Sequence, residues 1–384
     1  MHVVSCGGWS SDAYWAARVC RELERAGHDA TLVCRRGTEA RVISRARRLG
    51  VERIETLSLR TGLRPAADAR DLRAVLGWLP GADVVHVHRS KEHWLAAIAN
   101  RVSRTRRPLV RTRHIVQPIR PHALNRWLYR HATDLVVTVS EAIRRQCIAA
   151  GLVPQDRVVA LPGGADGERF QPSKDGDALG RELGLPVGRA PAGVPPAGVP
   201  QAGVPIVGLL SGFRVMKGHS IVVEAARSLA ASGRPFHLLF IGQGPFEPAI
   251  RDSVARAGLG DRATFLGFVE DPTRAVGALD IALYPSLESD GMSRVLFEYL
   301  AAGRAVIASR VGVAAEVLKD GESALLVPGG DAPELARALD RLLGDPALRR
   351  RLGESAAALA HERLTGARLT ARLIDHYRRL AAAP

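Results

Sequence analysis

The sequence predicts an α/β protein of two domains, and three observations support this prediction. The chain has 384 residues, which is longer than one ordinary hydrophobic core accommodates. Short apolar runs alternate with amphipathic segments along most of the chain, which is the pattern of βαβ units. Proline and glycine become frequent between residues 173 and 205. We therefore expect a first domain over residues 1–170, a linker over 171–204 and a second domain over 205–365.

The first domain opens with a βαβ unit. Residues 1–5 are an apolar run typical of a buried strand, residues 13–26 have an amphipathic helical pattern, and residues 31–34 form the next strand. The intervening loop, residues 6–12, contains Gly8 and Ser11. Such loops let backbone N–H groups approach a phosphate at a helix N-terminus, so either residue is a candidate phosphate contact. Further strands are expected at 54–59, 83–88, 109–112, 134–139 and 158–162, with helices at 68–79 and after Ser140.

Three histidines accompany the strands of this domain. His86 and His88 are alternate residues of one strand and share a face. They could form a metal pair, but no third ligand is identifiable, and we favour packing at the strand end with His88 facing a cleft. His114 follows the strand at 109–112. Ligand sites gather at the carboxyl ends of parallel strands, so His114 is a candidate site residue as well as a plain loop histidine.

The linker contains a five-residue repeat. PAGVP occurs at 191–195 and 196–200, and QAGVP follows at 201–205. Frequent proline and glycine exclude a regular helix or a central strand. Asp175 and Asp177 form a DxD pattern in this polar stretch, which we interpret as chance, and no metal site is expected anywhere in the chain.

The second domain begins with cations between a strand and a helix. The strand at 206–210 leads through Gly212, Arg214 and Lys217 to a helix at 221–231. Two cations in this position suit a diphosphate, although they could also be ordinary surface charges. Later strands, at 236–241 and 263–266, end in turns that we expect to bring backbone close to a nucleotide; the turns contain Gly244, and Gly267 with Phe268.

Two carboxylates lie between the strands at 280–284 and 305–309. Asp290 and Glu298 are eight residues apart, about two helical turns, which predicts a common side of one helix. Residues 289–291 could form a turn or the start of that helix. Glu298 has apolar neighbours, where an unpaired carboxylate is costly. It could accept hydrogen bonds from ligand hydroxyls, or it could be a glutamate paired with an arginine behind a helix-capping aspartate.

The net charge of +15 is unevenly distributed. Residues 1–165 contain 28 Lys/Arg and 14 Asp/Glu, whereas residues 166–384 contain 26 and 25. Arginine-rich composition explains part of this, but it would affect both halves. We infer that the first half meets an anionic membrane surface, a phosphorylated glycolipid or nucleic acid. The four cysteines form no CxxC pair, and neither a signal peptide nor a membrane-spanning run is recognised, so we expect a cytoplasmic protein.

The string from Asp290 to Pro328 resembles the donor-site signature of the retaining GT-B glycosyltransferases of group one, also called glycosyltransferase family four. The resemblance implies that Asp290 contacts the transferred sugar, although Asp replaces the usual Glu, and that Glu298 binds the nucleotide ribose. Arg214 and Lys217, in Arg-x-x-Lys-Gly-His, match a branch whose cations neutralise the leaving diphosphate. His114 matches a histidine that contacts the donor sugar, and residues 162–166 are similar to the family's Pro-Asn-Gly-Val-Asp hinge.

This resemblance implies an architecture and a reaction. Two Rossmann-like domains with doubly wound parallel sheets would face a cleft, the first binding the acceptor and the second the donor, while a terminal helix at 366–384 packs back on the first. The reaction would be metal-independent, retaining transfer of a sugar from a nucleotide-diphosphate sugar, a co-substrate with no further cofactor. Donor contacts would be Gly8, Ser11, Gly212, Arg214, Lys217, Gly244, Gly267, Phe268, Met292, Ser293 and Glu298.

The implied acceptor is an anionic glycan or glycolipid in the assembly of lipopolysaccharide or another cell-surface polysaccharide, with peripheral contact to the inner face of an anionic membrane. Two alternatives belong to other classes. A nucleotide-sugar epimerase or hydrolase on the same fold would consume donor without acceptor. A nucleic-acid-binding protein is disfavoured, because aromatic residues make up only 5% of the chain and are not interleaved with the arginine clusters.

Overall fold

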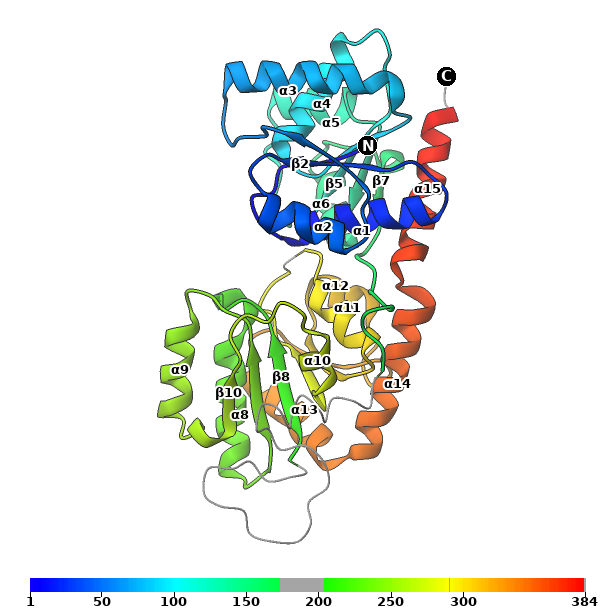
Figure 1. Ribbon diagram of the computed structural model, residues 1–384. Helices are drawn as coiled ribbons and strands as arrows, with labels where there is room; N and C mark the ends of the chain where they lie inside the picture. The colour runs from blue at the N-terminus through cyan, green and yellow to red at the C-terminus, as the bar shows by residue number, and fades with distance from the viewer. Residues whose placement is uncertain (173–203, 290, 383–384) are drawn as a thin grey trace. The chain divides into compact units, whose positions relative to one another are not determined.

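The computed structural model describes residues 1–172, 204–289 and 291–382 (Figure 1). The chain divides into two compact units, one of Met1–Gly163 with Gly366–Pro384 and the other of Gly164–Thr365. The PAGVP repeats at 191–200, the DxD pattern at 175–177 and Asp290 lie outside the described residues.

The first unit is built on a seven-stranded parallel sheet in the order β3-β2-β1-β4-β5-β6-β7. Both neighbours of the first strand are parallel to it, and the strand order reverses there. The strands are β1 His2–Val4, β2 Thr31–Arg35, β3 Arg53–Leu57, β4 Val85–Val87, β5 Leu109–Arg113, β6 Leu135–Thr138 and β7 Val158–Ala160. Most of their residues are buried, as expected for parallel strands covered on both faces.

Helices connect these strands, and a helix from the far end of the sequence joins them. The helices are α1 Ser11–Arg25, α2 Ser44–Arg48, α3 Pro65–Trp78, α4 Ser90–Val102, α5 Ala123–His131, α6 Glu141–Ala149 and α15 Gly366–Ala382. The start of α6 was predictable from Ser140, whose Oγ accepts a hydrogen bond from Ile143 N at 3.3 Å. Helix α15 packs on α1, so closely that a Cβ on Gly366 would lie 2.4 Å from Nη2 of Arg18.

The second unit is built on a six-stranded parallel sheet in the order β10-β9-β8-β11-β12-β13. Its strands are β8 Ile206–Leu210, β9 His237–Ile241, β10 Ala263–Phe265, β11 Ile281–Tyr284, β12 Ala305–Ser309 and β13 Leu325–Val327. Its helices are α8 His219–Ala231, α9 Glu247–Arg256, α10 Thr273–Gly277, α11 Arg294–Ala301, α12 Gly312–Val317, α13 Ala332–Gly344 and α14 Pro346–Arg363.

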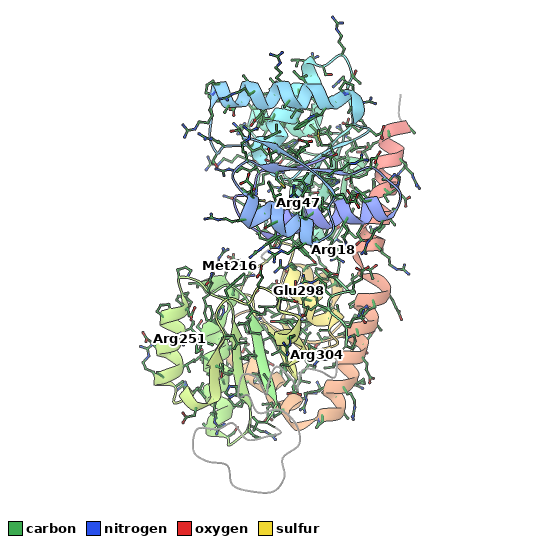
Figure 2. All side chains as sticks on the ribbon, in the orientation of Figure 1. Arg18, Arg47, Met216, Arg251, Glu298 and Arg304 are labelled. Carbon is green, nitrogen blue, oxygen red and sulfur yellow. The ribbon has the colours of Figure 1, made fainter. Side chains whose placement is uncertain are left out.

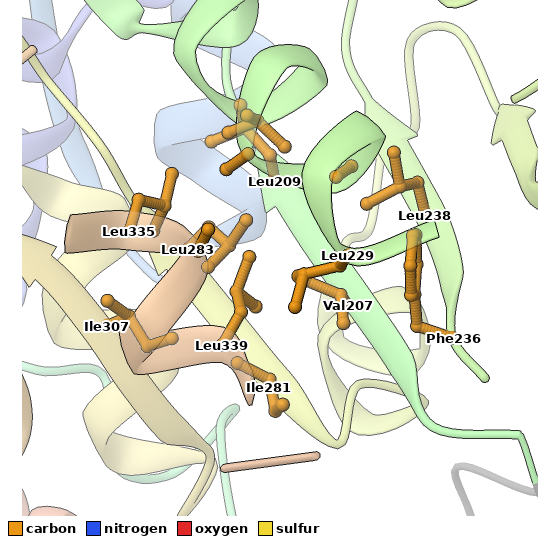
Figure 3. Packing of buried hydrophobic residues seen from close by; sticks show 14 of the residues in the cluster. Val207, Leu209, Leu229, Phe236, Leu238, Ile281, Leu283, Ile307, Leu335 and Leu339 are labelled. Carbon is orange, nitrogen blue, oxygen red and sulfur yellow. The ribbon is translucent and has the colours of Figure 1, made fainter. Parts of the chain in front are cut away.

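Alternate residues of β8 enter different hydrophobic clusters. Val207 and Leu209 pack with Leu229 of α8 and Leu339 of α13 in the cluster of Figure 3, whereas Ile206 packs on the opposite face with α11 and α14. Side chains of a strand alternate between its faces, so a strand buried on both faces reads as a continuous apolar run. Each fully buried leucine contributes about 1.5–3 kcal/mol, so the two clusters fix the sheet between its helical layers.

The predicted fold class is confirmed, since both units are α/β with parallel sheets. Of the two alternatives for residues 289–291, the helix start was wrong. The helix that carries Glu298 begins at Arg294 and not at 289–291, and the preceding Ser293 has a left-handed backbone with φ of 50°. The helix therefore does not extend back to position 290, and the spacing of eight residues does not place Asp290 and Glu298 on one side of a helix.

Candidate functional site

The second unit has a ligand-binding topology at β8 and β11. These two strands are neighbours in the sheet although β9 and β10 come between them in the sequence, and the strand order reverses between them. In open parallel sheets, the loops at the carboxyl ends of two such strands diverge and leave a crevice in which ligands bind. The loop after β8 contains Arg214 and Lys217, and the segment after β11 leads to Glu298.

The loop after β8 is held against the loop after β11. Backbone N–H of Leu287 donates to the carbonyl of Met216 at 2.9 Å. Gly218 has φ of 72°, and a Cβ there would lie 2.0 Å from the carbonyl oxygen of Pro285, so the close approach requires glycine. Lys217 ends a short 3₁₀ turn and is half-buried, and Arg214 before the turn is exposed.

The glycines of the neighbouring loops differ in whether the backbone around them requires a glycine. A Cβ on Gly244 would lie 2.5 Å from the carbonyl of Phe213, so backbone packing after β9 requires this glycine. Gly267, with φ of 67°, accepts a hydrogen bond from Gly242 N at 2.7 Å, and Phe268 beside it is 55% exposed. A Cβ on Gly212 would lie 3.6 Å from the carbonyl oxygen of Gln243, which is an ordinary van der Waals contact. Backbone packing therefore does not require a glycine at this position.

Glu298 is the least satisfied carboxylate of this region. Its side chain on α11 is buried, and Oε1 pairs with Nε of Arg294, one turn earlier, at 3.0 Å. Its Oε2 is also buried and has no hydrogen-bond partner among the described residues. A buried acceptor without a donor is costly unless a ligand supplies one. Figure 2 shows Glu298 and Met216 toward the same end of the second unit.

The segment before α11 is tightly constrained. Ser293 hydrogen-bonds through Oγ to the hydroxyl of Tyr284 at the end of β11, and it keeps a left-handed backbone that is unusual for serine. Met292 is buried beside it. Strained backbone that the surroundings hold in place is typical of ligand-binding turns. Lys217 thus lies in the loop after β8, whereas Met292 and Ser293 lie in the adjoining segment after β11 and Glu298 on the helix that follows. Their common role in donor binding stays a prediction.

In the first unit, the loop that contains Gly8 ends differently from the prediction. Ser11 is the first residue of α1, and Asp12 in its first turn accepts hydrogen bonds from Ser10 Oγ and from Arg89 Nε. Burial raises the pKa of Asp12, but the Arg89 hydrogen bond and its neighbours outweigh it and hold the pKa below the usual range. No sequence pattern indicates this ion pair, because its two residues are 77 positions apart. A phosphate-contacting role for Gly8 or Ser11 stays a prediction.

His114 follows β5 directly and is buried. Its Nε2 lies 3.1 Å from Nδ1 of His88, and its Nδ1 has no partner among the described residues. Burial lowers the pKa of His114 to about 3, assisted by Arg111 and opposed by Asp12, so the ring is neutral at pH 7. His86 and His88 stack with centroids 4.7 Å apart, which is a packing arrangement. Within the described residues, no group of three or more His, Cys, Asp or Glu side chains could hold a metal.

The same described ranges contain four free, buried cysteines and no helix long and apolar enough to span a membrane.

Two family profiles match the chain. One, described as glycosyltransferase family 4, matches residues 13–169, and one described as glycosyl transferases group 1 matches residues 204–345. A 2-deoxystreptamine N-acetyl-D-glucosaminyltransferase of Streptomyces fradiae is 30% identical over 78% of this chain and 71% of its own length. The chain therefore belongs to the group 1 glycosyltransferases, and the resemblance seen in the sequence is confirmed at the level of the family.

Other similar proteins are glycosyltransferases named for different substrates. A D-inositol 3-phosphate glycosyltransferase of Nocardia farcinica is 31% identical over 76% of this chain. A 2-deoxystreptamine glucosyltransferase of Streptomyces kanamyceticus is 31% identical over 59% of it. The chain spans 66% and 55% of the lengths of these two relatives.

Solved structures share the whole fold. A glycosyltransferase from Rickettsia africae superposes with a TM-score of 0.85 at 18% identity, covering 100% of this chain and 98% of its own. HepE from Anabaena, in complex with UDP and glucose, gives 0.81 at 19% identity and covers 99% of both chains. The GT-B glycosyltransferase fold is thus the architecture of this protein.

Proposed function

We propose that the protein transfers a sugar from a nucleotide-diphosphate sugar to a hydroxyl of a glycan or glycolipid, with retained anomeric configuration and without a metal. The observation that carries the proposal is the buried Oε2 of Glu298, which has no partner among the described residues and lies on the helix after β11, one of the two strands between which the strand order reverses. A ribose hydroxyl would satisfy that oxygen, and the cationic loop with Arg214 and Lys217 lies after the adjacent strand. The UDP complex of HepE supports a nucleotide-sugar donor.

The chemistry follows from where charge develops. As the bond to the sugar breaks, the leaving diphosphate gains negative charge, and Arg214, Lys217 and backbone amides stabilise it. Glu298 orients the ribose, while Asp290 and His114 orient the sugar. The acceptor hydroxyl attacks on the face from which the diphosphate leaves, and the diphosphate accepts its proton. No side chain is required as a covalent nucleophile.

Binding of UDP, GDP and their sugars, measured by calorimetry and thermal shift with EDTA present, tests the donor. A nucleoside diphosphate that binds without divalent metal supports the proposal, and strict dependence on magnesium refutes the metal-independent reaction. Product analysis by NMR with and without acceptor then separates the activities, because an epimerase or hydrolase consumes donor alone. An inverted anomeric product would exclude retention.

A cationic surface on the first unit bears on the acceptor. Residues 93–133 contain nine arginines and no Asp or Glu. The arginines exposed on α4, α5 and the segments beside them are Arg101, Arg104, Arg106, Arg120, Arg126 and Arg130. A field of one sign without compensating carboxylates attracts anionic partners.

Apolar side chains lie within this cationic surface. Trp94, Ile98 and Val102 are spaced four residues apart on α4, and the last two are 41% and 61% exposed. Trp94 stacks on Trp127 of α5 at 5.9 Å, and Leu124, one turn earlier, is 65% exposed. Arginines around exposed aliphatic and indole groups match an anionic bilayer, into which the apolar groups insert. We assign this surface to peripheral contact with the membrane that holds the glycolipid acceptor.

A further inference from the structure

Six side chains of the first unit form one hydrogen-bonded chain, here called the histidine chain: Thr112, His86, Tyr377, His2, His88 and His114. Nε2 of His86 lies 2.5 Å from Oγ1 of Thr112, and its Nδ1 bonds the hydroxyl of Tyr377. That hydroxyl also lies 3.2 Å from Nε2 of His2. Tyr377 belongs to α15 and His2 to β1, so this hydrogen bond links the last helix of the sequence to the first strand.

The second half of the histidine chain ends at His114, which follows the carboxyl end of β5. Nδ1 of His2 lies 3.2 Å from Nε2 of His88, and Nδ1 of His88 lies 3.1 Å from Nε2 of His114. Trp15 of α1 packs against His86, His88 and His114. The four imidazoles are buried, and every ring nitrogen except Nδ1 of His114 has a partner within the histidine chain.

All four imidazoles are neutral at pH 7. Burial lowers the pKa of His2, His86 and His88 well below the usual value, as it lowers that of His114. A neutral imidazole has one N–H donor and one acceptor nitrogen. A proton on one ring nitrogen therefore makes the other nitrogen an acceptor. Because a donor must face an acceptor, the tautomer of one ring determines the tautomer of the next.

The hydroxyl of Tyr377 determines which partner donates in each hydrogen bond of the histidine chain. Its single hydrogen can be donated to His2, to His86 or to neither. If it bonds His2, then His2 donates to His88, His88 donates to His114, and His114 carries its proton on Nδ1. If it bonds His86, all the donors reverse, and His86 must donate to Thr112. The third possibility leaves the hydrogen outside the histidine chain, and the phenolic oxygen then accepts two N–H groups.

The first arrangement is the one that satisfies the buried groups. The Thr112 side chain is fully buried, and within the described residues its hydroxyl has His86 as its hydrogen-bond partner. A reversed chain would leave the Thr112 hydrogen without an acceptor, which is costly. The third arrangement uses the phenolic oxygen, a good donor but a weak acceptor, for two bonds. Without a ligand, and counted over the described residues, the first arrangement leaves one group unpaired, the N–H at Nδ1 of His114. Each of the other two leaves the Nδ1 lone pair of His114 and one hydroxyl hydrogen unpaired. The first is therefore favoured before any ligand binds, and a ligand that accepts from Nδ1 completes it.

We propose that Tyr377 is a positioning residue that, through His2 and His88, holds the proton of His114 on Nδ1, so that this atom donates a hydrogen bond to the donor sugar. The role toward the sugar rests on the proposed function, whereas the position of the proton does not. Tyr377, His2 and His86 also line a cavity of about 880 Å³ at the amino ends of β1 and β4. The histidine chain thus connects the two ends of the sheet.

Nitrogen-15 NMR of histidine-labelled protein at pH 7, without ligand, tests the proton position. His114, assigned by its loss in His114→Gln, shows a single Nδ1–H tautomer in the wild type. Tyr377→Phe removes the donor to His2 and yields a mixture of tautomers at His114. Tyr129→Phe is the matched control, since Tyr129 is buried in the same unit outside the histidine chain, and it keeps the single tautomer.

A second pair of variants keeps the test decisive if Tyr377→Phe unfolds. Thr112→Val releases His86 to accept from Tyr377 and gives the same mixture, while Thr112→Ser restores the single tautomer. An Nε2–H tautomer in the wild type, or an unchanged His114 in both Tyr377→Phe and Thr112→Val, overturns the proposal. With UDP-glucose as donor, Tyr377→Phe lowers kcat by about five- to tenfold, the effect of one neutral hydrogen bond. Failure of wild-type turnover counts against the proposed function and leaves the NMR result standing.

Discussion

Lys217 and Arg214 are the residues on which the proposed transfer depends. Lys217→Ala should lower kcat by about 10²–10³-fold, the range for removing one group that stabilises developing charge, because the diphosphate loses a cation as it leaves. The fold should persist, since Lys217 is only half-buried and belongs to neither hydrophobic cluster of the second unit. Steady-state kinetics with the donor identified by calorimetry measure the effect.

Lys319→Ala is the control for this substitution. Lys319 is an exposed lysine of the same unit, paired with Glu322 at 3.5 Å, and its loss should leave kcat unchanged. Equal turnover by Lys217→Ala and the wild type would contradict the role of the cationic loop.

Glu298 offers a test of nucleotide binding that is separate from catalysis. Glu298→Gln should weaken UDP binding by about tenfold or more, because hydrogen bonds to a charged acceptor contribute about 1.5–3 kcal/mol. Calorimetry with UDP measures the change, and Glu322→Gln, which alters an exposed carboxylate, serves for comparison. UDP binding that is equally strong in Glu298→Gln and the wild type would show that the free Oε2 faces no ribose.

At the residue scale, the sequence indicated single side chains better than it indicated their partners. The burial of Glu298 and the position of His114 after β5 agree with the pattern of apolar runs. The ion pair of Asp12 with Arg89 and the bond of His2 to Tyr377 link positions that are 77 and 375 residues apart. Periodicity concerns neighbours along one element, so it contains no information about such pairs.

At the scale of the element, Gly218 joins the two loops of the candidate site. Gly218→Ala should destabilise the second unit by about 2–4 kcal/mol and abolish UDP binding, because left-handed backbone is unfavourable for alanine and the Pro285 carbonyl must move. Gly258→Ala is the matched control, since Gly258 has φ of 69° and open space around it; it should cost only about 1–2 kcal/mol. Urea unfolding gives both values, and equal losses would mean that the contact with Pro285 has no energetic weight.

The cationic surface on α4, α5 and the segments beside them predicts binding to anionic membranes. Replacing both Arg101 and Arg104 with alanine should weaken sedimentation with phosphatidylglycerol vesicles by about tenfold or more, since each basic residue near such a surface contributes about 1 kcal/mol. Ile98→Ser should weaken it further by removing an inserted apolar group. Alanine at both Arg350 and Arg351, exposed on α14, should have no effect.

Phosphatidylcholine vesicles should bind none of these proteins. Equal binding of both lipids, or a preference for single-stranded DNA over phosphatidylglycerol, would contradict the assignment of this surface.

Boundaries of elements followed the sequence where an apolar run or a cap marks them. The strands β8 and β12 begin and end where the apolar runs do. The start of α11 was misplaced because Ser289 and Gly291 look like a cap and a turn, whereas Ser293 precedes the helix in a left-handed conformation that serine rarely adopts. Tertiary constraint, here the hydrogen bond from Ser293 to Tyr284, overrode the local preference.

At the scale of the whole molecule, buried histidines are unequally shared between the two units. The first unit buries His2, His86, His88, His93 and His114, and the second buries His219 and His237. Burial lowers the pKa of each of them, to about 3 for His114 and about 4 for His219 and His237. A histidine held neutral in the folded protein stabilises it fully above its unfolded pKa of about 6.5. That contribution is lost as the pH falls toward the folded value.

Acidification should therefore unfold the first unit before the second. Between pH 7 and pH 5, each such histidine lowers the free energy of unfolding by about 2 kcal/mol, and the larger number lies in the first unit. All five tryptophans also lie there, at positions 9, 15, 78, 94 and 127, so their fluorescence follows that unit, whereas far-ultraviolet circular dichroism follows both. The urea midpoint from fluorescence should fall steeply with pH, and the dichroism curve should separate into two transitions. Coincident curves at pH 5 would mean that the two units unfold as one.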